Sequence, residues 1–276
     1  MKVDFHIHSL YSDGVYTVPE ILPFLKKADI QAFSLTDHDT VDGITEARKL
    51  SRGQLKFVSG IEFTCREQEM YPGGEQFSIH LLGYQFDEEN QVLRQRLDKR
   101  KRMVKTVFDQ LCKLLTEMGC PVQREEIPIS CGNVLQLCDV AEYIRACYAQ
   151  AEEKVFSCIG SFAARLNEVN IPAAEAIALI RQAGGKSVWA HPFCVYKDFM
   201  KVRIDRQEIN ESLAFLESVG LDGLEADYLG FTGEERKWLR TLARERGLIY
   251  TAGSDFHGSR KRSELGIEIT EGGMLP

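Results

Sequence analysis

All six histidines of the 276-residue chain lie where they could share one chemical role. His6-Ile-His8 places two imidazoles at i and i+2, which point to the same face of an extended segment. With the acidic residues near the other histidines, the candidate ligands are His6, His8, Asp13, His38, Glu62, His80, His191, Asp255 and His257. Imidazole and carboxylate groups gathered in one place are typical of a site for divalent transition metals.

Taken singly, these residues have ordinary explanations. His80 alone would most often be a hydrogen-bonded structural histidine, the H-x-H pattern is only moderately specific, and D-x-H is weaker. The whole set is different, because no histidine is left over for ordinary surface or core positions. We therefore interpret the set as one metal site.

Short apolar runs alternate with amphipathic stretches over most of the chain. Strands are predicted at 2–7, 32–36, 56–59, 79–84, 186–190, 223–226 and 248–252, and helices at 17–28, 44–51, 172–182, 209–219 and 234–246. Strands followed by helices predict a parallel α/β arrangement, in which functional groups gather at the carboxyl ends of the strands. Every histidine lies at or just beyond a predicted strand end, which supports this fold class.

Residues 90–170 interrupt this alternation of strands and helices. They are charged, free of histidine and helical in pattern, with one long amphipathic helix from Leu93 to Met118 that ends at Gly119 and Pro121. Two further helices are predicted at 134–150 and 154–168. We expect a catalytic domain formed by 1–89 and 171–276, with 90–170 as an inserted helical subdomain that covers the site.

The composition excludes several classes of protein. The formal net charge is −7, which does not suit sequence-independent binding of duplex DNA. No apolar run is long enough to span a bilayer and no secretory signal is present, so we expect a soluble, cytoplasmic protein. The eight cysteines include no C-x-x-C pair, and we expect reduced thiols. The oligomeric state stays open.

Six segments carry a resemblance to a known family: HIHSLYSDG (6–14), TDHDTVDG (36–43), GIEFT (60–64), HLLGY (80–84), AGGKSVWAHP (183–192) and GSDFHG (253–258). In order and spacing, they resemble the polymerase and histidinol phosphatase (PHP) family of metal-dependent phosphoesterases, in particular its small stand-alone nucleotide-phosphatase-like branch. The resemblance implies a distorted (β/α)7 barrel with the metals at the carboxyl-end mouth.

The resemblance also implies how the ligands divide. One ion would take His6, His8, Glu62 and Asp255, a second would take Glu62, His80 and His191, and a third would take Asp13, His38 and His257. Glu62 would therefore bridge two ions. Two to three divalent ions are expected, manganese first, with iron or zinc as alternatives. Of the acidic residues flanking His38, Asp37 or Asp39 could orient a ligand imidazole, or both could be plain solvated turn residues.

The expected chemistry is phosphoester hydrolysis by a metal-bound hydroxide held by Glu62, Asp255 and His191. Three divalent ions and three carboxylates leave a local charge of about +3, which attracts phosphate within an acidic protein. Lys99 and Arg102 match an R-x-x-R pair that contacts substrate phosphate in the resembling branch, and Arg100 interrupts the apolar stripe of the same helix. A solvated basic face is the alternative for these three cations.

The substrate is expected to be a phosphomonoester of a nucleotide or small metabolite. The alternatives are 5′–3′ exonucleolytic cleavage of short single-stranded oligonucleotides, histidinol-phosphate hydrolysis, and a non-enzymatic accessory module, against which the complete ligand set argues. Relatives that act on 3′,5′-bisphosphonucleotides carry a Gly-Arg-Pro-His-like segment, whereas residues 133–142 here contain neither arginine nor histidine. Phe193-Cys194 after Ala-His-Pro is also bulkier than usual, so recognition of a second phosphate is not expected.

Overall fold

The computed structural model describes residues 1–66, 68–69, 76–197, 200–258 and 264–269. A single sheet organises the fold, in the order β11-β10-β7-β6-β3-β2-β1-β12. Its strands are β1 (Lys2–Ile7), β2 (Ala32–Leu35), β3 (Lys56–Thr64), β6 (His80–Tyr84), β7 (Lys186–Trp189), β10 (Gly223–Tyr228), β11 (Ile249–Gly253) and β12 (Ile267–Glu268). Hydrogen bonds from His8 N to Phe256 O (2.9 Å) and from Phe256 N to His6 O (3.2 Å) join the end of β1 to the segment after β11 and nearly close a barrel.

Most barrel strands are parallel, as the sequence predicts, but β6 is not. It pairs antiparallel with both β3 and β7. The chain between β3 and β6 folds into the antiparallel pair β4 (Gln68–Glu69) and β5 (Gln76–Phe77), a connection that reverses direction without the crossover that a parallel return requires. The expectation of a uniformly parallel barrel is therefore wrong at this strand, and the amino end of β6, with His80, lies beside the carboxyl end of β3.

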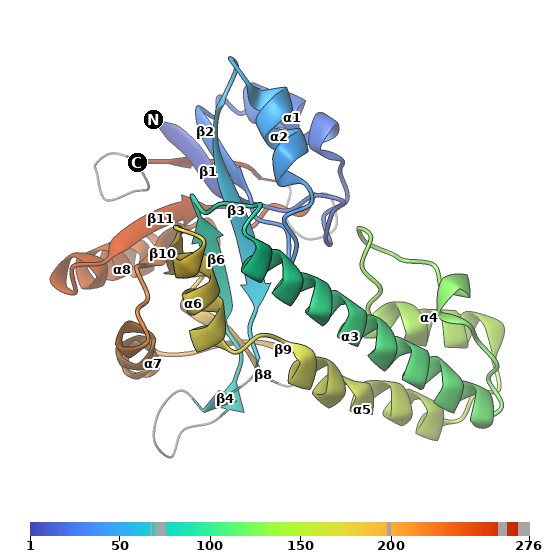
Figure 1. The fold of residues 1–276 in the computed structure, drawn as a ribbon. Coiled ribbons are helices and arrows are strands. Elements are labelled where there is room, and N and C mark those ends of the chain that lie inside the picture. The colour runs from blue at the N-terminus through green and yellow to red at the C-terminus, as the bar shows by residue number, and fades with distance from the viewer. Residues whose placement is uncertain (67, 70–75, 198–199, 259–263, 270–276) are drawn as a thin grey trace.

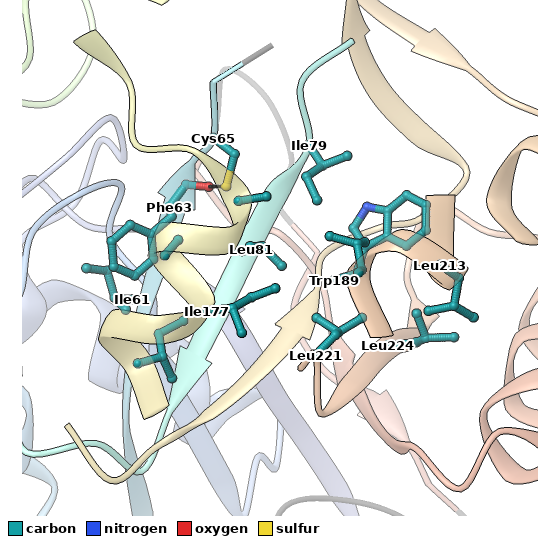
Figure 2. Close-up of a cluster of buried hydrophobic side chains, with 14 of the residues drawn as sticks. Ile61, Phe63, Cys65, Ile79, Leu81, Ile177, Trp189, Leu213, Leu221 and Leu224 are labelled. Carbon is teal, nitrogen blue, oxygen red and sulfur yellow. Dashed lines mark hydrogen bonds between the residues drawn. The ribbon is translucent and has the colours of Figure 1, made fainter. Parts of the chain in front are cut away.

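Helices cover the outside of the barrel: α1 (Val18–Lys27), α2 (Ile44–Ser51), α6 (Ala173–Gln182), α7 (Arg206–Ser218) and α8 (Gly233–Glu245). A capping box begins α1, since Thr17 N donates to Glu20 Oε2 at 2.8 Å. Figure 2 shows Ile177 of α6 beside Leu81 of β6 and Ile61 of β3 in the apolar layer between sheet and helices. The α/β barrel expected from the sequence is confirmed.

Alternation along β3 explains how one strand serves both core and site. Ile61 and Phe63 are fully buried in the helix-facing core, and Glu62 between them points to the opposite face, into the barrel. A one-residue change of register would exchange these roles, so the buried apolar face fixes where the carboxylate lies.

Residues 90–170 form α3 (Gln91–Glu117), a short 3₁₀ turn (Arg124–Glu126), α4 (Leu137–Cys147) and α5 (Glu153–Val169), which lie together on one side of the barrel (Figure 1). Most of their apolar side chains, among them Phe108, Leu111 and Phe162, form a cluster separate from those of the barrel, whereas Leu93 and Leu97 at the start of α3 pack in a barrel cluster. The helices match the expected ones closely, and the division into a barrel and an inserted subdomain stays our interpretation. No helix in the described part of the chain is long and apolar enough to cross a membrane.

Candidate metal centre

Glu62 lies at the centre of the barrel mouth, fully buried and surrounded by imidazoles. Its Oε2 is 3.1 Å from both His6 Nε2 and His8 Nε2, and 3.4 Å from His38 Nε2. Its Oε1 is 3.0 Å from His80 Nδ1 and 3.4 Å from His191 Nε2. One carboxylate thus faces five histidines that come from four different parts of the chain.

Two further carboxylates complete the cluster. Asp255 Oδ1 lies 3.4 Å from His8 Nε2 and 3.3 Å from His257 Nδ1. Asp13 Oδ1 lies 3.2 Å from His257 Nε2 and 3.6 Å from His8 Nδ1. The structure therefore brings together every residue that the sequence nominated as a ligand.

Three subsets of these residues have ligand atoms within 4.8 Å of one another: His6, His8, Glu62 and Asp255; His8, Asp13, His38 and His257; and His38, Glu62 and His80. The first subset is the one implied for the first ion. The second contains the set implied for the third ion, with His8 added. The third shares Glu62 and His80 with the set implied for the second ion, and His191 lies near the same carboxylate oxygen as His80, Oε1 of Glu62.

Buried polar atoms without a partner show that the cluster is suited to cations. His6 Nε2, both ring nitrogens of His8, Glu62 Oε2 and His191 Nε2 have no hydrogen bond of acceptable geometry, although all are buried. Each such atom costs on the order of 1–3 kcal/mol when nothing satisfies it. Divalent ions would satisfy all of them at once, and the donor set of imidazole and carboxylate suits a transition metal.

The charges within the cluster are strongly coupled. Burial favours protonation of Glu62, but the neighbouring histidines, His6 first, outweigh it and hold the pKa of Glu62 well below its usual range. The pKa of Asp255 is lowered in the same way, mainly through His8. Burial opposes charge on His8, yet the nearby carboxylates of Asp255 and Glu62, 3.4 and 3.1 Å from its Nε2, raise its pKa to about 9. The carboxylates are thus ready to bind a cation, and His8 must lose a proton first.

Glu225 on β10 is a functional residue that the sequence analysis missed. It is fully buried; its Oε1 lies 2.8 Å from His6 Nδ1, and its Oε2 accepts a hydrogen bond from His191 N at 2.8 Å. The bond at Nδ1 orients the His6 ring so that Nε2 faces Glu62 and Asp255. Gly253 permits this close approach, because a Cβ there would lie 2.2 Å from His6 Cβ and 2.6 Å from Glu225 Oε1. The available signal was a glutamate within the apolar run Gly223–Ala226.

Asp37 and Asp39 are neither solvated nor bonded to an imidazole. Asp37 accepts hydrogen bonds from Ser9 N (2.7 Å), Ser9 Oγ (2.7 Å) and Ser12 Oγ (2.6 Å), and so fixes the loop that carries Asp13. Asp39 accepts from Thr64 N at 3.2 Å and pairs with Arg100 at 3.0 Å. Both aspartates therefore position the segments around the site.

The cations of α3 lie in two different environments. Arg100 is largely buried between Asp39 and Asn170, whose Oδ1 accepts a hydrogen bond from Arg100 Nη2 at 2.7 Å. Lys99 and Arg102 are exposed. Contact of any of the three with substrate stays a prediction, and the structure shows that Arg100 also joins α3 to the barrel.

A second contact joins the insertion to the mouth at the loop that carries Asp13. Cys131 Sγ lies 2.8 Å from Asp13 O, and Asn133 N donates to Ser12 O at 2.9 Å. Gly132 between them has φ +66°, and a Cβ there would lie 1.9 Å from Ser12 O. The segment that lacks the Gly-Arg-Pro-His-like pattern thus begins directly beside a candidate ligand.

Backbone strain also concentrates at the mouth. His191 and Asp255 have φ of +33° and +57°, in the left-handed region that non-glycine residues rarely adopt. Such strain is kept where the surrounding structure requires a particular side-chain position. Here it places one imidazole and one carboxylate at the mouth.

Comparison with known proteins agrees with this geometry. Residues 4–182 match the PHP domain model. The chain is 26% identical to a 5′–3′ exoribonuclease of Haemophilus influenzae over 97% of this chain and 94% of that protein. It is 21% identical to a 3′,5′-nucleoside bisphosphate phosphatase of Chromobacterium violaceum, over 93% and 87% of the two chains.

Among solved structures, a protein of Bifidobacterium adolescentis provisionally named a metal-dependent phosphoesterase superposes with a TM-score of 0.70 at 23% identity, covering 97% of this chain and 92% of that one. At this identity the likeness concerns the fold. The family match covers more than half of the sequence and includes six of the nine clustered residues. The chain therefore belongs to the PHP domain family, and it is a hydrolytic phosphoesterase.

Proposed function

We propose that this enzyme removes a terminal phosphate from a nucleotide or a similar small metabolite, with two to three divalent ions held at the barrel mouth. The observation that carries the proposal is the environment of Glu62. A fully buried carboxylate faces five imidazoles, and several of the atoms that face it have no hydrogen bond. This arrangement is costly in a protein without cations and favourable in one that binds them.

The nine clustered residues would hold the ions, in the subsets described above. Bound divalent ions would polarise phosphoryl oxygens as Lewis acids. They would also lower the pKa of a bound water molecule toward about 7, so that it could lose a proton at neutral pH. Manganese is our first expectation, with iron and zinc as alternatives: six imidazoles and three carboxylates suit these metals, and no thiolate is among the clustered residues.

The chain's own residues prepare the mouth for an anionic ester. Glu62, Asp13 and Asp255 carry negative charge in the folded protein because the histidines lower their pKa values. With ions in place the mouth becomes positive, which attracts a phosphate group. Glu225 fixes the ring of His6, and Asp37 fixes the Asp13 loop, so these groups are oriented before substrate arrives.

The walls of the mouth favour a terminal ester. The insertion approaches the Asp13 side through Cys131 and Asn133, and Tyr196 stacks on His80 at the other side, with ring centroids 4.3 Å apart. A chain end fits between two such walls more readily than the middle of a long polynucleotide. The near full-length similarity to an exoribonuclease makes stepwise cleavage from a 5′ end the second candidate, since it also acts on a terminal ester.

A panel of substrates with manganese-loaded protein tests the proposal. It should contain nucleoside monophosphates, a 3′,5′-bisphosphonucleotide, histidinol phosphate and a short 5′-phosphorylated oligoribonucleotide. We expect inorganic phosphate from a nucleotide monoester as the fastest reaction. Release of mononucleotides from the oligoribonucleotide at a higher kcat/KM would replace the monoester assignment by the exonuclease. Absence of hydrolysis throughout, with metal bound, would contradict both candidates.

A further inference from the structure

A β-hairpin that the sequence analysis did not predict forms one wall of the mouth. It consists of β8 (Cys194–Lys197) and β9 (Met200–Arg203), which pair antiparallel directly after His191. Ser78 and Tyr196 exchange backbone hydrogen bonds of 2.7 and 2.9 Å, so the hairpin is fixed beside the amino end of β6. Its position is therefore set by the same strand that supplies His80.

One face of this hairpin points into the mouth. Tyr196 and Lys201 are directly opposite each other in the pairing register, so their side chains share a face. The Tyr196 ring stacks on His80 with an interplanar angle of 16°. Lys201 reaches the other side of the mouth, where its Nζ lies 3.2 Å from Tyr228 Oη.

Tyr228 connects this lysine to the candidate metal centre. Its hydroxyl donates to Asp255 Oδ2 at 3.0 Å, while Asp255 Oδ1 faces the histidines. The Tyr228 ring is 2% exposed, and the Lys201 ammonium lies 5.5 Å from its centroid. Tyr228 therefore holds the positive charge of Lys201 two hydrogen bonds away from the candidate ligand Asp255.

The charge of Lys201 differs from that of three arginines elsewhere in the protein. Arg100 pairs with Asp39, Arg203 with Glu235, and Arg240 with Asp227. Among the residues that the structure describes, no carboxylate lies within ion-pair distance of Lys201, whose side chain is exposed. Within the described ranges its hydrogen-bond partner is a neutral hydroxyl, so two further ammonium donors can meet an anion.

We infer that Lys201 binds a phosphoryl oxygen of the substrate, and that Tyr228 is a positioning residue that holds the ammonium group beside Asp255. The inference rests on the proposed function and deepens it, because it names a phosphate contact on the hairpin. The phosphate group at the mouth would then lie between the ions and a single lysine. The lysine ammonium group is a compact charge on a flexible side chain, so it can stay in contact with the phosphoryl oxygens as they move during the reaction.

The test compares Lys201→Met, Lys201→Arg and Lys113→Met in the full-length, manganese-loaded protein. Lys113 is exposed on α3 and serves as the matched control. Two probes are measured: inorganic phosphate by titration calorimetry, and p-nitrophenyl phosphate by steady-state hydrolysis. We expect Lys201→Met to raise the dissociation constant for phosphate and the KM by about 10- to 100-fold, the usual effect of losing a charged hydrogen bond. Lys201→Arg should recover part of the loss, and Lys113→Met should behave as the wild type.

Manganese content and melting temperature must stay at wild-type values in Lys201→Met, because the lysine is not a metal ligand. Tyr228→Phe should raise KM less than Lys201→Met does. Phosphate binding by Lys201→Met that equals that of Lys113→Met would overturn the inference. If the wild-type protein bound phosphate but hydrolysed no ester, the proposed function would be wrong. The phosphate titration of Lys201→Met would still show whether Lys201 binds phosphate.

Discussion

In the barrel, the side chains buried at the mouth are histidines and carboxylates, whereas those buried among α3, α4 and α5 are almost all apolar. The insertion gains stability from its own apolar core, which includes Leu111, Phe108 and Ile144. The mouth buries charges and unsatisfied nitrogens, which is unfavourable until cations bind. The two regions should therefore respond differently to substitution: changes to the clustered ligands at the mouth alter metal binding, whereas changes to the exposed cations of the insertion leave metal binding unchanged.

The largest effect is expected for Glu62→Gln. Glutamine keeps the size of the side chain but removes the charge that five histidines face. Loss of an outer hydrogen-bond partner of a metal ligand costs about 10- to 100-fold in metal affinity or activity, and loss of a bridging ligand should exceed that range. We expect kcat/KM to fall by more than about 100-fold and metal content to drop in elemental analysis.

Glu117→Gln, an exposed change on α3, is the control for Glu62→Gln and should have no effect. The decisive comparison is with His6→Ala. If Glu62→Gln kept near-full activity while His6→Ala lost it, Glu62 would not bridge two ions, and the mouth would need another central ligand.

The next effect is expected for Glu225→Gln. An amide at this position can still accept a hydrogen bond from His6 Nδ1, but it no longer stabilises positive charge on the ring or fixes its tautomer as firmly. We expect metal affinity to fall by about 10- to 100-fold. Competition with a fluorescent chelator would measure this affinity directly.

Glu234→Gln, exposed at the start of α8, is the matched control. Unchanged metal affinity in Glu225→Gln, together with a lower melting temperature, would mean that Glu225 only stabilises the barrel.

The third predicted effect is a difference in pH dependence between the stability of the metal-free protein and its affinity for metal. The pKa of His8 is raised to about 9 from its ordinary value of 6.5, since the nearby carboxylates of Asp255 and Glu62 outweigh burial. Between these two pH values the folded protein binds more protons than the unfolded chain. This stabilisation is fully present below pH 6.5 and is lost as pH rises through 9. Metal binding requires neutral imidazole, so its pH dependence has the opposite sign.

We therefore expect the melting temperature of the metal-free protein to fall between pH 7 and pH 9, while manganese affinity rises by about tenfold per pH unit for each proton displaced. Scanning fluorimetry and calorimetry in buffers of different ionisation enthalpy measure the two quantities. A rise of both quantities with pH would show that His8 is neutral before metal binds.

The same contrast between regions explains what could be predicted from the sequence. The clustering of the candidate ligands was predictable because histidines are rare and each lies at a strand end, and the helices of residues 90–170 were predictable from their apolar periodicity. Glu225 was missed because one glutamate in an apolar strand has many explanations until its partner, distant in sequence, is known. The β8–β9 hairpin and the reversed β6 were missed because strand direction and pairing depend on contacts across the sheet, and four-residue runs have little periodicity of their own.

The smallest effect is expected on the insertion, for the exposed cations Lys99 and Arg102. Exposed charges are screened by water and salt, and Lys201 is in addition held in place by Tyr228, so each contact of Lys99 or Arg102 with a phosphate should contribute less than the contact proposed for Lys201. We expect Lys99→Glu and Arg102→Glu to raise KM by about two- to tenfold, which corresponds to about 0.4–1.4 kcal/mol.

Three features would identify such an effect as a substrate contact. Metal content and melting temperature should match the wild type, the increase in KM should shrink at high salt, and Lys113→Glu on the same helix should leave KM unchanged. Equal KM values in all three variants would leave only a solvated basic face on α3. The insertion would then influence the mouth only by holding its segments in place. Arg100 holds Asp39, and Cys131 and Asn133 contact the Asp13 loop; none of these contacts requires an exposed cation.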